Sequence, residues 1–297
     1  MSNQAFLVTG ASGHLGRRVL ELLLAQGVGP IVATTRTPEA LKEFAAKGVE
    51  VRRADFEDEK GLADAFRGVG RALLISTDAL DRPGRRLAQH AAALRAFEVS
   101  GVTHVVYTSL TNPRVGSPVL IAGDHRETEA ALAASRLDFT ILRNNLYADL
   151  LLQSLPQAIA SGQLVDARGE GAIGLVTRED CARAAAAALS GAAAGRRTLD
   201  VTGPATVTSA EIAAIASELS GRTVNHVSVP PDALEAGLVQ HGLPPGVAKL
   251  LVSFDVAAQK GELAVATSVV KDLTGHAPQS VAAFLEAHRA ALVPARS

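Results

Sequence analysis

The chain has 297 residues, of which one is cysteine and two are tyrosine, and its net charge is −1. The lone cysteine, Cys181, excludes an intramolecular disulfide and a cysteine-rich metal cluster. The near-zero charge argues against nucleic acid or an anionic membrane as a partner, because both require clustered Lys and Arg. No apolar run reaches the roughly 18 residues of a membrane span, and no basic segment precedes a long apolar one. We therefore expect a cytoplasmic protein that binds neither nucleic acid nor membrane.

The motifs of several enzyme classes are absent as well. A short-chain dehydrogenase that reduces a simple carbonyl normally has a Y-x-x-x-K pair, in which the lysine lowers the phenol pKa for proton exchange. Here Thr111 stands at the lysine position for Tyr107, and Leu151 stands there for Tyr147. H-E-x-x-H, a Walker lysine and G-x-S-x-G are also missing. The sequence therefore predicts no metal site and a reaction that needs no strong protein acid.

A glycine-spaced turn between a short apolar strand and a helix is present. Gly10, Gly13 and Gly16 follow the apolar run Ala5–Val8, and a helical pattern begins at Leu15. Such a turn lets the backbone approach a ligand closely, and the helix start favours an anion such as a pyrophosphate. Because the spacing is G-x-x-G-x-x-G rather than G-x-G-x-x-G, an ordinary strand-to-helix turn is the alternative. The flanking strand and helix favour a dinucleotide.

Arg36 bears on the choice of cofactor. It follows the expected strand Ile31–Thr35, where an NAD-binding fold carries an acid for the ribose 2′-OH. A guanidinium at this place can pair with a 2′-phosphate, whereas a carboxylate would repel it. NADP(H) is therefore favoured over NAD(H). The alternative is a solvated arginine at the end of a strand.

Strands and helices alternate regularly up to Asn145. The expected strands are Ala5–Val8, Ile31–Thr35, Val49–Ala54, Ala72–Ile75, His104–Tyr107 and Phe139–Leu142. This alternation predicts an α/β fold with a doubly wound parallel sheet (Rossmann) and a smaller, mainly helical C-terminal domain. We expect residues 1–155, with 173–202 returning to them, to form the nucleotide-binding domain. Residues 156–172 and 203–297 are expected to form the substrate domain.

Ligands of such sheets bind outside the carboxyl ends of the strands. The residues expected there are Gly10, Ser12, Gly13, His14, Leu15, Arg36, Asp55, Ile75, Ser76, Thr77, Tyr107, Thr108, Ser109, Arg143, Asn144 and Asn145. Asp55 is expected either to border the adenine or to serve as a turn or N-cap residue. His14 is expected to face solvent rather than to act as a base.

Two expected helices carry further information. Arg85–Ser100 is predicted to be a helix with Leu87, Ala91, Leu94 and Val99 facing inward. In the helix predicted for residues 124–134, His125 and Glu129 share a face, so that the carboxylate can hold the imidazole in one tautomer above the site. A surface contact near the helix start is the alternative for this pair.

Several segments together resemble the NmrA-like atypical short-chain dehydrogenases. They are Thr9–Gly16, Leu73–Ser76, Tyr107–Leu110, Asp124–Glu129 and the R-N-x-x-Y segment within Leu142–Tyr147. The chain is most similar to the bacterial type 2 NAD(P)H:quinone oxidoreductases and to the related triphenylmethane reductases. The resemblance extends over nearly the whole chain, and that family also lacks the tyrosine-lysine pair.

The resemblance implies an NADPH-dependent reductase of quinones or similar aromatic acceptors. The loop Gly10–Leu15 would hold the pyrophosphate, Arg36 the 2′-phosphate and Ile75–Thr77 the ribose side of the cofactor. Residues 143–147 would border the nicotinamide, with Tyr107 and Tyr147 close to the bound quinone. Hydride transfer to a quinone also fits the missing acid, because the charge delocalises onto the phenolate oxygens and water can supply the protons.

Two departures and one alternative accompany this resemblance. His14 stands where a glutamine is common, and Asn145-Leu146 replaces the Gly-Trp of some quinone reductases at the presumed substrate pocket. A non-catalytic redox sensor is the alternative, because NmrA itself is a regulator that binds dinucleotides without turning them over. A homodimer is left open, since the sequence does not give the oligomeric state.

Overall fold

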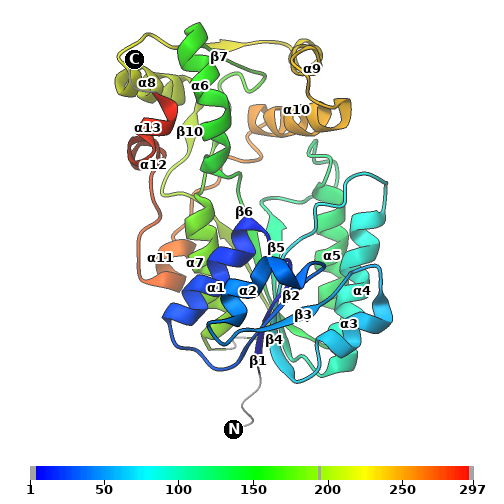
Figure 1. The fold of residues 1–297 in the computed structure, drawn as a ribbon. Helices are drawn as coiled ribbons and strands as arrows, with labels where there is room; N and C mark the ends of the chain where they lie inside the picture. Colours follow the sequence, from blue (N-terminus) through cyan, green and yellow to red (C-terminus); the bar gives the residue numbers. More distant parts are fainter. Residues whose placement is uncertain (1–4, 193–194, 294–297) are drawn as a thin grey trace. The chain divides into compact units, whose positions relative to one another are not determined.

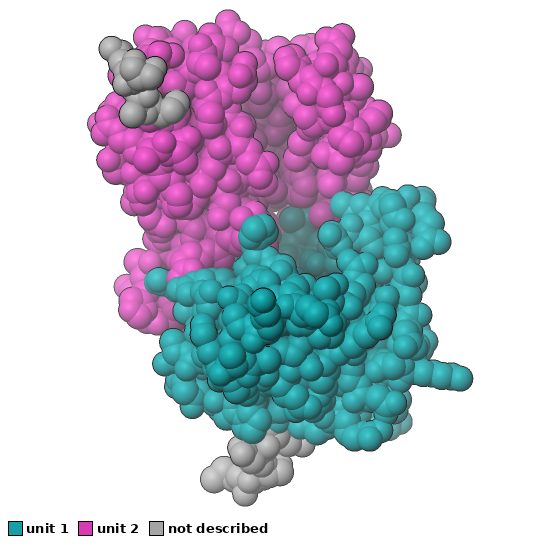
Figure 2. Space-filling model, in the orientation of Figure 1, with its two compact units in different colours: residues 1–110, 124–144, 181–199 teal, residues 111–123, 145–180, 200–297 magenta. Residues whose placement is uncertain are grey.

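The computed structural model describes residues 5–192 and 195–293, which divide into two compact units (Figures 1 and 2). Unit 1 comprises residues 1–110, 124–144 and 181–199. Unit 2 comprises residues 111–123, 145–180 and 200–297. Both units therefore draw on segments that are far apart in the sequence.

A seven-stranded sheet organises unit 1, in the order β3-β2-β1-β4-β5-β6-β9. Its strands are β1 (Ala5–Val8), β2 (Ile31–Thr35), β3 (Glu50–Arg53), β4 (Val69–Leu74), β5 (His104–Leu110), β6 (Asp138–Asn144) and β9 (Arg197–Val201). The pairs from β3 to β6 are parallel. The strand order reverses between β1 and β4, and a doubly wound sheet binds its ligand at the carboxyl ends beside such a reversal. The predicted fold class is confirmed.

Helices cover both faces of this sheet (Figure 1). On one face lie α3 (Glu59–Ala65), α4 (Arg85–Ser100) and α5 (Ala122–Ala134), and on the other lie α1 (His14–Ala25) and α7 (Arg178–Ser190). The core under α3 and α4 includes Phe66 and Phe97, whose rings stack with centroids 4.7 Å apart. Between β2 and β3 run the short η1 (Pro38–Leu41) and α2 (Lys42–Ala45).

The buried face of α4 differs from the prediction. Val99, expected inward, is 78% exposed, whereas Arg86 and His90 are buried beside Leu94 and Phe97. The prediction is wrong for Val99 because the buried face of α4 runs through His90, Ala93 and Phe97, and a residue two positions after Phe97 points to the other side of the helix. Arg86 and His90 instead point inward, where they form hydrogen bonds with other residues of unit 1.

Unit 2 is mainly helical, with two small sheets. Its helices are η2 (Ala148–Leu150), α6 (Leu151–Ser161), α8 (Ser209–Ser220), α9 (Pro231–Gln240), α10 (Pro245–Gln259), α11 (Val269–Thr274), α12 (Val281–Ala287) and α13 (Arg289–Leu292). Parallel β7 (Gln163–Asp166) and β11 (Asn225–Ser228) form one sheet, and antiparallel β8 (Ala172–Ile173) and β10 (Val207–Thr208) form the other. In the described ranges, no helix combines the length and apolarity that a bilayer crossing requires.

Candidate functional site

The glycine turn is built by close backbone contacts. Gly10 has a φ of +57°, which favours glycine, and its carbonyl accepts a hydrogen bond from Gly13 N–H at 3.0 Å. A Cβ on Gly16 would lie 2.5 Å from that same carbonyl oxygen and 2.7 Å from the Cα of Ala11. Helix α1 starts at His14 without a side-chain cap, so the N–H groups of its first turn have no side-chain acceptor there. The turn thus has the shape and polarity of an anion site.

The exposed part of the turn is anchored to the end of β2. Ser12, Gly13 and His14 are exposed, as predicted for His14, while Leu15 is buried. The Ser12 hydroxyl accepts a hydrogen bond from Thr35 Oγ1 at 3.0 Å. Arg17 donates to the Ser12 carbonyl at 3.1 Å and pairs with Glu43. Arg17 is therefore engaged within the protein.

Arg36 follows β2 directly and is exposed. Within residues 5–192 and 195–293, its side chain makes no hydrogen bond or ion pair. Its guanidinium is thus available for an anion near the glycine turn. Asp55 is also exposed, and its Oδ1 accepts a hydrogen bond from Glu57 N–H at 3.0 Å. This aspartate serves a turn, which is one of the two alternatives given for it.

The loop after β4 is held by side chains from α4, from β5 and from Thr9, which directly follows β1. Each of three consecutive backbone N–H groups donates to a different side chain. The bonds run from Ile75 to Thr9 Oγ1 (3.1 Å), from Ser76 to Thr108 Oγ1 (2.9 Å) and from Thr77 to His90 Nε2 (3.1 Å). The Thr77 carbonyl accepts a hydrogen bond from Arg86 Nε at 2.7 Å. The backbone of this loop is fixed before any ligand arrives.

Thr77 leaves one polar atom for a ligand. Its Oγ1 is buried and has no hydrogen-bond partner within residues 5–192 and 195–293. A buried hydroxyl without a partner is uncommon and often marks a ligand or an ordered water. The predicted residues Ile75, Ser76 and Thr77 thus lie at the carboxyl end of β4, where the hydroxyl of Thr77 can still form a hydrogen bond.

Tyr107 and His125 lie in the interior of unit 1. Tyr107 is 0% exposed and His125 is 3% exposed. The phenol oxygen of Tyr107 is 2.8 Å from Nδ1 of His125, and Nε2 of His125 is 2.8 Å from Nη2 of Arg86. A guanidinium only donates, so Nε2 of His125 accepts and Nδ1–H donates to the phenol. Both ring nitrogens of His125 are therefore hydrogen-bonded, one to Tyr107 and the other to Arg86.

Burial sets the protonation states of this pair. It lowers the pKa of His125 well below the ordinary value, and the nearby charge of Arg86 lowers it further. Burial also raises the pKa of the Tyr107 phenol. The imidazole is neutral and the phenol protonated at neutral pH. This arrangement favours a supporting role for both residues over contact with an acceptor.

Glu129 has other partners than the His125 predicted for it. Its carboxylate binds Arg143 through two hydrogen bonds, at 3.0 Å from Nε and 2.6 Å from Nη2. The Ser109 hydroxyl donates to the same carboxylate at 2.6 Å. Glu129 of α5 thus connects the carboxyl ends of β5 and β6. Asn144, which ends β6, is buried.

Asn145 and Tyr147 belong to unit 2. Asn145 is buried, its Nδ2 donates to the Leu263 carbonyl at 3.0 Å, and its Oδ1 accepts from Leu146 N–H at 2.9 Å. The guanidinium carbon of Arg178 lies 5.1 Å from the ring centroid of Tyr147, which is half-buried. The ring is thus held on one side by a cation and keeps some exposed surface.

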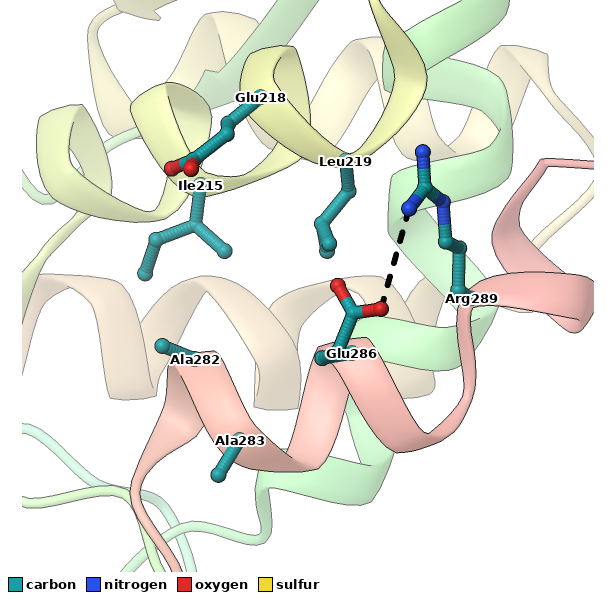
Figure 3. A pocket seen from close by; sticks show the side chains of 7 residues that line it. All are labelled: Ile215, Glu218, Leu219, Ala282, Ala283, Glu286 and Arg289. Atoms are coloured by element: carbon teal, nitrogen blue, oxygen red, sulfur yellow. Dashed lines mark ion pairs between the residues drawn. The ribbon is translucent and has the colours of Figure 1, made fainter.

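A pocket elsewhere in unit 2 contains none of the predicted residues (Figure 3). Its volume is about 510 Å³, and α8, α12 and α13 provide its walls. It is lined by Ile215, Glu218, Leu219, Ala282, Ala283, Glu286 and Arg289. Arg289 Nη1 and Glu286 Oε1 are 3.8 Å apart across its edge. The pocket offers no group that bears on hydride transfer.

Sequence reasoning missed Thr9, Arg86 and His90. Thr9 immediately precedes the first glycine, and the motif alone assigns its hydroxyl no partner, whereas in the structure it accepts from Ile75 N–H. Arg86 and His90 are spaced as neighbours on one helix face, which was a usable signal. Their inward direction does not follow from composition, because charged and polar side chains are mostly exposed and are buried only where they are paired.

Comparisons with known proteins support a dinucleotide site. Residues 10–191 match the model of a family described as NAD(P)H-binding. Quinone oxidoreductase 2 of Escherichia coli (strain K12) is 36% identical over 276 residues, which cover 93% of this chain and 95% of that protein.

Solved structures give the same result. The NADPH-dependent quinone oxidoreductase of Escherichia coli, in complex with NADPH, has a TM-score of 0.89 at 36% identity and covers 95% of this chain and 99% of its own. The triphenylmethane reductase of Citrobacter sp., in complex with NADP(H), has a TM-score of 0.89 at 31% identity with the same coverage, 95% and 99%.

Proposed function

The chain belongs to the NAD(P)H-binding family that its residues 10–191 match, and we propose that it transfers a hydride from NADPH to a quinone or a similar conjugated aromatic acceptor. The resemblance to type 2 quinone oxidoreductases and triphenylmethane reductases is confirmed, and NADP(H) is the cofactor that the family implies. A small-molecule substrate follows from this kinship. The cytoplasmic location, the homodimer and the boundaries of a substrate domain stay predictions.

The observation that carries the proposal is the glycine turn with an unengaged Arg36 beside it. Position 16 has no room for a side chain, because a Cβ there would meet the backbone of Gly10 and Ala11, and this fits the close helix–strand packing of a dinucleotide-binding turn. Arg36 then supplies a charge for the 2′-phosphate that distinguishes NADPH from NADH. The unpartnered Thr77 Oγ1 is a further candidate to bind the ribose side of the cofactor.

When bound, the nicotinamide supplies the hydride. The residues of this chain bind and orient the two reactants, which is the main requirement of such a reaction. Tyr107 is not exposed, so it is not proposed as the proton donor. A quinone needs no strong protein acid, because its reduced form spreads the charge over both oxygens and takes its protons from water. Tyr147 stays the proposed neighbour of the acceptor.

A redox sensor is the second candidate. The burial of Tyr107 and His125 suits a sensor as well as a quinone reductase, because neither function requires these side chains to exchange a proton with a bound substrate. A sensor would keep the same glycine turn and Arg36. The two functions differ only in turnover.

The test is NADPH oxidation by the purified protein, followed by absorbance, with and without a panel of benzoquinones, naphthoquinones and triphenylmethane dyes. We expect oxidation that depends on the acceptor and saturates with it. Tight NADPH binding without turnover on any acceptor would favour the sensor. The same assay with NADH shows whether the cofactor preference has the expected direction.

A further inference from the structure

We propose that Arg86 and His90 of α4 are positioning residues that hold the Ile75–Thr77 loop in the conformation that receives the ribose end of the cofactor. This inference rests on the proposed function, since it names the support of the same site. Neither residue is part of the glycine turn or of the acceptor side, and both are buried.

Both residues reach the same loop residue. They lie four positions apart on α4 and are 4% and 0% exposed. Arg86 Nε donates to the carbonyl of Thr77 at 2.7 Å, and His90 Nε2 accepts from the N–H of Thr77 at 3.1 Å. One turn of α4 thus satisfies both backbone groups of the residue whose hydroxyl is left for a ligand.

The hydrogen bonds around His90 admit one protonation state. Because Nε2 accepts from Thr77, the proton is on Nδ1, which lies 2.9 Å from Thr128 Oγ1. Thr128 in turn donates to the Asp124 carbonyl at 2.7 Å. Burial, followed by the charge of Arg86, lowers the pKa of His90 to about 3, so the ring stays neutral. The acceptor for the Thr77 amide is therefore permanent at neutral pH.

Arg86 is fixed from the other side by α5. Its Nη2 donates to His125 Nε2 at 2.8 Å, and its Nη1 lies 3.7 Å from Asp124 Oδ2. His125 is held by Tyr107 of β5. The loop, α4, α5 and β5 are thus connected through one guanidinium, so its position cannot change without breaking several bonds.

The occupied amides determine what the loop can recognise. With the N–H groups of Ile75, Ser76 and Thr77 all engaged, the loop has no free backbone donor for a phosphate. In the part of the chain that is described, the carbonyls of Ile75 and Ser76 accept no hydrogen bond. The loop therefore presents acceptors, which suit the hydroxyl groups of a ribose or the amide group of a nicotinamide.

The test compares His90→Phe with His90→Gln in the full-length protein. Phenylalanine fills the space without an acceptor, whereas the glutamine oxygen can take the place of Nε2. We expect His90→Phe to weaken NADPH binding about five- to tenfold, as for one lost hydrogen bond, and His90→Gln to stay within about threefold of wild type. Dissociation constants come from the quenching of cofactor fluorescence. NADH should lose affinity by the same factor, because both cofactors share the ribose.

His104→Phe is the matched control. His104 is a buried histidine at the start of β5, bonded through Nε2 to Thr140 Oγ1 at 3.1 Å. It therefore lies at the amino end of its strand, away from the carboxyl ends where the cofactor is proposed to bind. Its loss should lower stability without changing either dissociation constant. Equal NADPH affinity in wild type and His90→Phe, or equal weakening in the phenylalanine and glutamine variants, would overturn the positioning role alone. A wild-type protein that binds no NADPH would overturn the proposed function with it.

Discussion

Arg36 is the side chain that we expect to decide between NADPH and NADH. It is exposed, follows β2 and has no partner in residues 5–192 and 195–293, whereas Arg17 of α1 pairs with Glu43. A charge without a protein partner is free to take the 2′-phosphate. The discrimination between the two cofactors should therefore respond to position 36 and to few others.

Arg36→Glu should weaken NADPH binding by about 2–3 kcal/mol, because a charge-assisted pair is lost and a repulsion is added. NADH, which has no 2′-phosphate, should be affected much less. Titration of both cofactors measures the difference. Arg67→Glu makes the same charge change at an exposed residue that precedes β4, and it should leave both affinities unchanged. Equal losses for NADPH and NADH would remove Arg36 from this role.

Tyr107→Phe distinguishes support from catalysis. The lost hydroxyl leaves Nδ1–H of buried His125 without its acceptor, which should cost about 1–3 kcal/mol of stability. Because the phenol is buried, kcat with a quinone should stay within about threefold of wild type. Urea denaturation and steady-state kinetics measure the two quantities. A large fall in kcat at unchanged stability would instead assign the phenol to the reaction.

The residues of the candidate site could be predicted from strand ends but not from side-chain direction. The pattern placed Ile75–Thr77 and Arg36 at carboxyl ends, where the structure has them. It gave no means to see that Tyr107 points into the core, because a strand buried on both faces has no polar alternation to read. The roles of Arg86 and His90 could not be predicted either, because polar side chains of a helix that bond inside the protein have the same sequence pattern as those that face solvent.

Among the elements, the strand–turn–helix unit of β1 and α1 depends most on one small residue. Gly16 packs directly on the backbone of Gly10 and Ala11. Neither neighbour is a flexible side chain that can move aside. The contact fixes how closely α1 approaches β1 and hence where its N-terminus points.

Gly16→Ala should lower the free energy of unfolding by about 1–3 kcal/mol and abolish tight NADPH binding, since the added methyl group separates helix and turn. Gly237→Ala is the control, because a Cβ at that position in α9 would have no atom of the described chain within 4 Å apart from its chain neighbours and the backbone of its own helix. It should be neutral or stabilise by up to about 1 kcal/mol through helix propensity. Chemical denaturation and cofactor titration measure both variants. An unchanged affinity in Gly16→Ala would contradict the close approach.

The regular elements of unit 1 followed from the sequence, whereas the pairing of the short strands of unit 2 did not. Alternating strands and helices of ordinary length carry a strong periodic signal. By contrast, β8 and β10 have two residues each, and β7 pairs with β11 across a long separation in sequence. Strands this short have no detectable period, so their pairing is decided by tertiary packing.

For the molecule as a whole, stability should depend on three buried histidines. Burial is the main cause that lowers the pKa of His90 to about 3, of His104 to about 4, and of His125 well below its ordinary value. In the unfolded chain these residues take up protons near pH 6.5. Below that pH the unfolded state binds more protons than the folded state, so stability is full above pH 6.5 and falls on acidification.

The expected loss is about 1.4 kcal/mol per pH unit for each histidine once the pH is well below 6.5, and about 4 kcal/mol per unit for the three together. Urea denaturation between pH 7.5 and about 4.5 measures the slope. His104→Gln removes one titrating group from the unfolded state and should reduce the slope by about 1.4 kcal/mol per unit. A slope that is unchanged in this variant would show that His104 is not neutral in the folded protein.

The engaged amides of Ile75, Ser76 and Thr77 also affect how a ligand is received. Ordering a backbone costs about 1–2 kcal/mol of conformational entropy per residue. In this loop the entropy is lost during folding rather than during binding, because Thr9, Thr108 and His90 already hold the loop backbone in the free protein. A cofactor therefore meets a surface that is already rigid, and association requires little loss of chain freedom at this point. The loop favours binding in one fast step, without a slower ordering step after first contact.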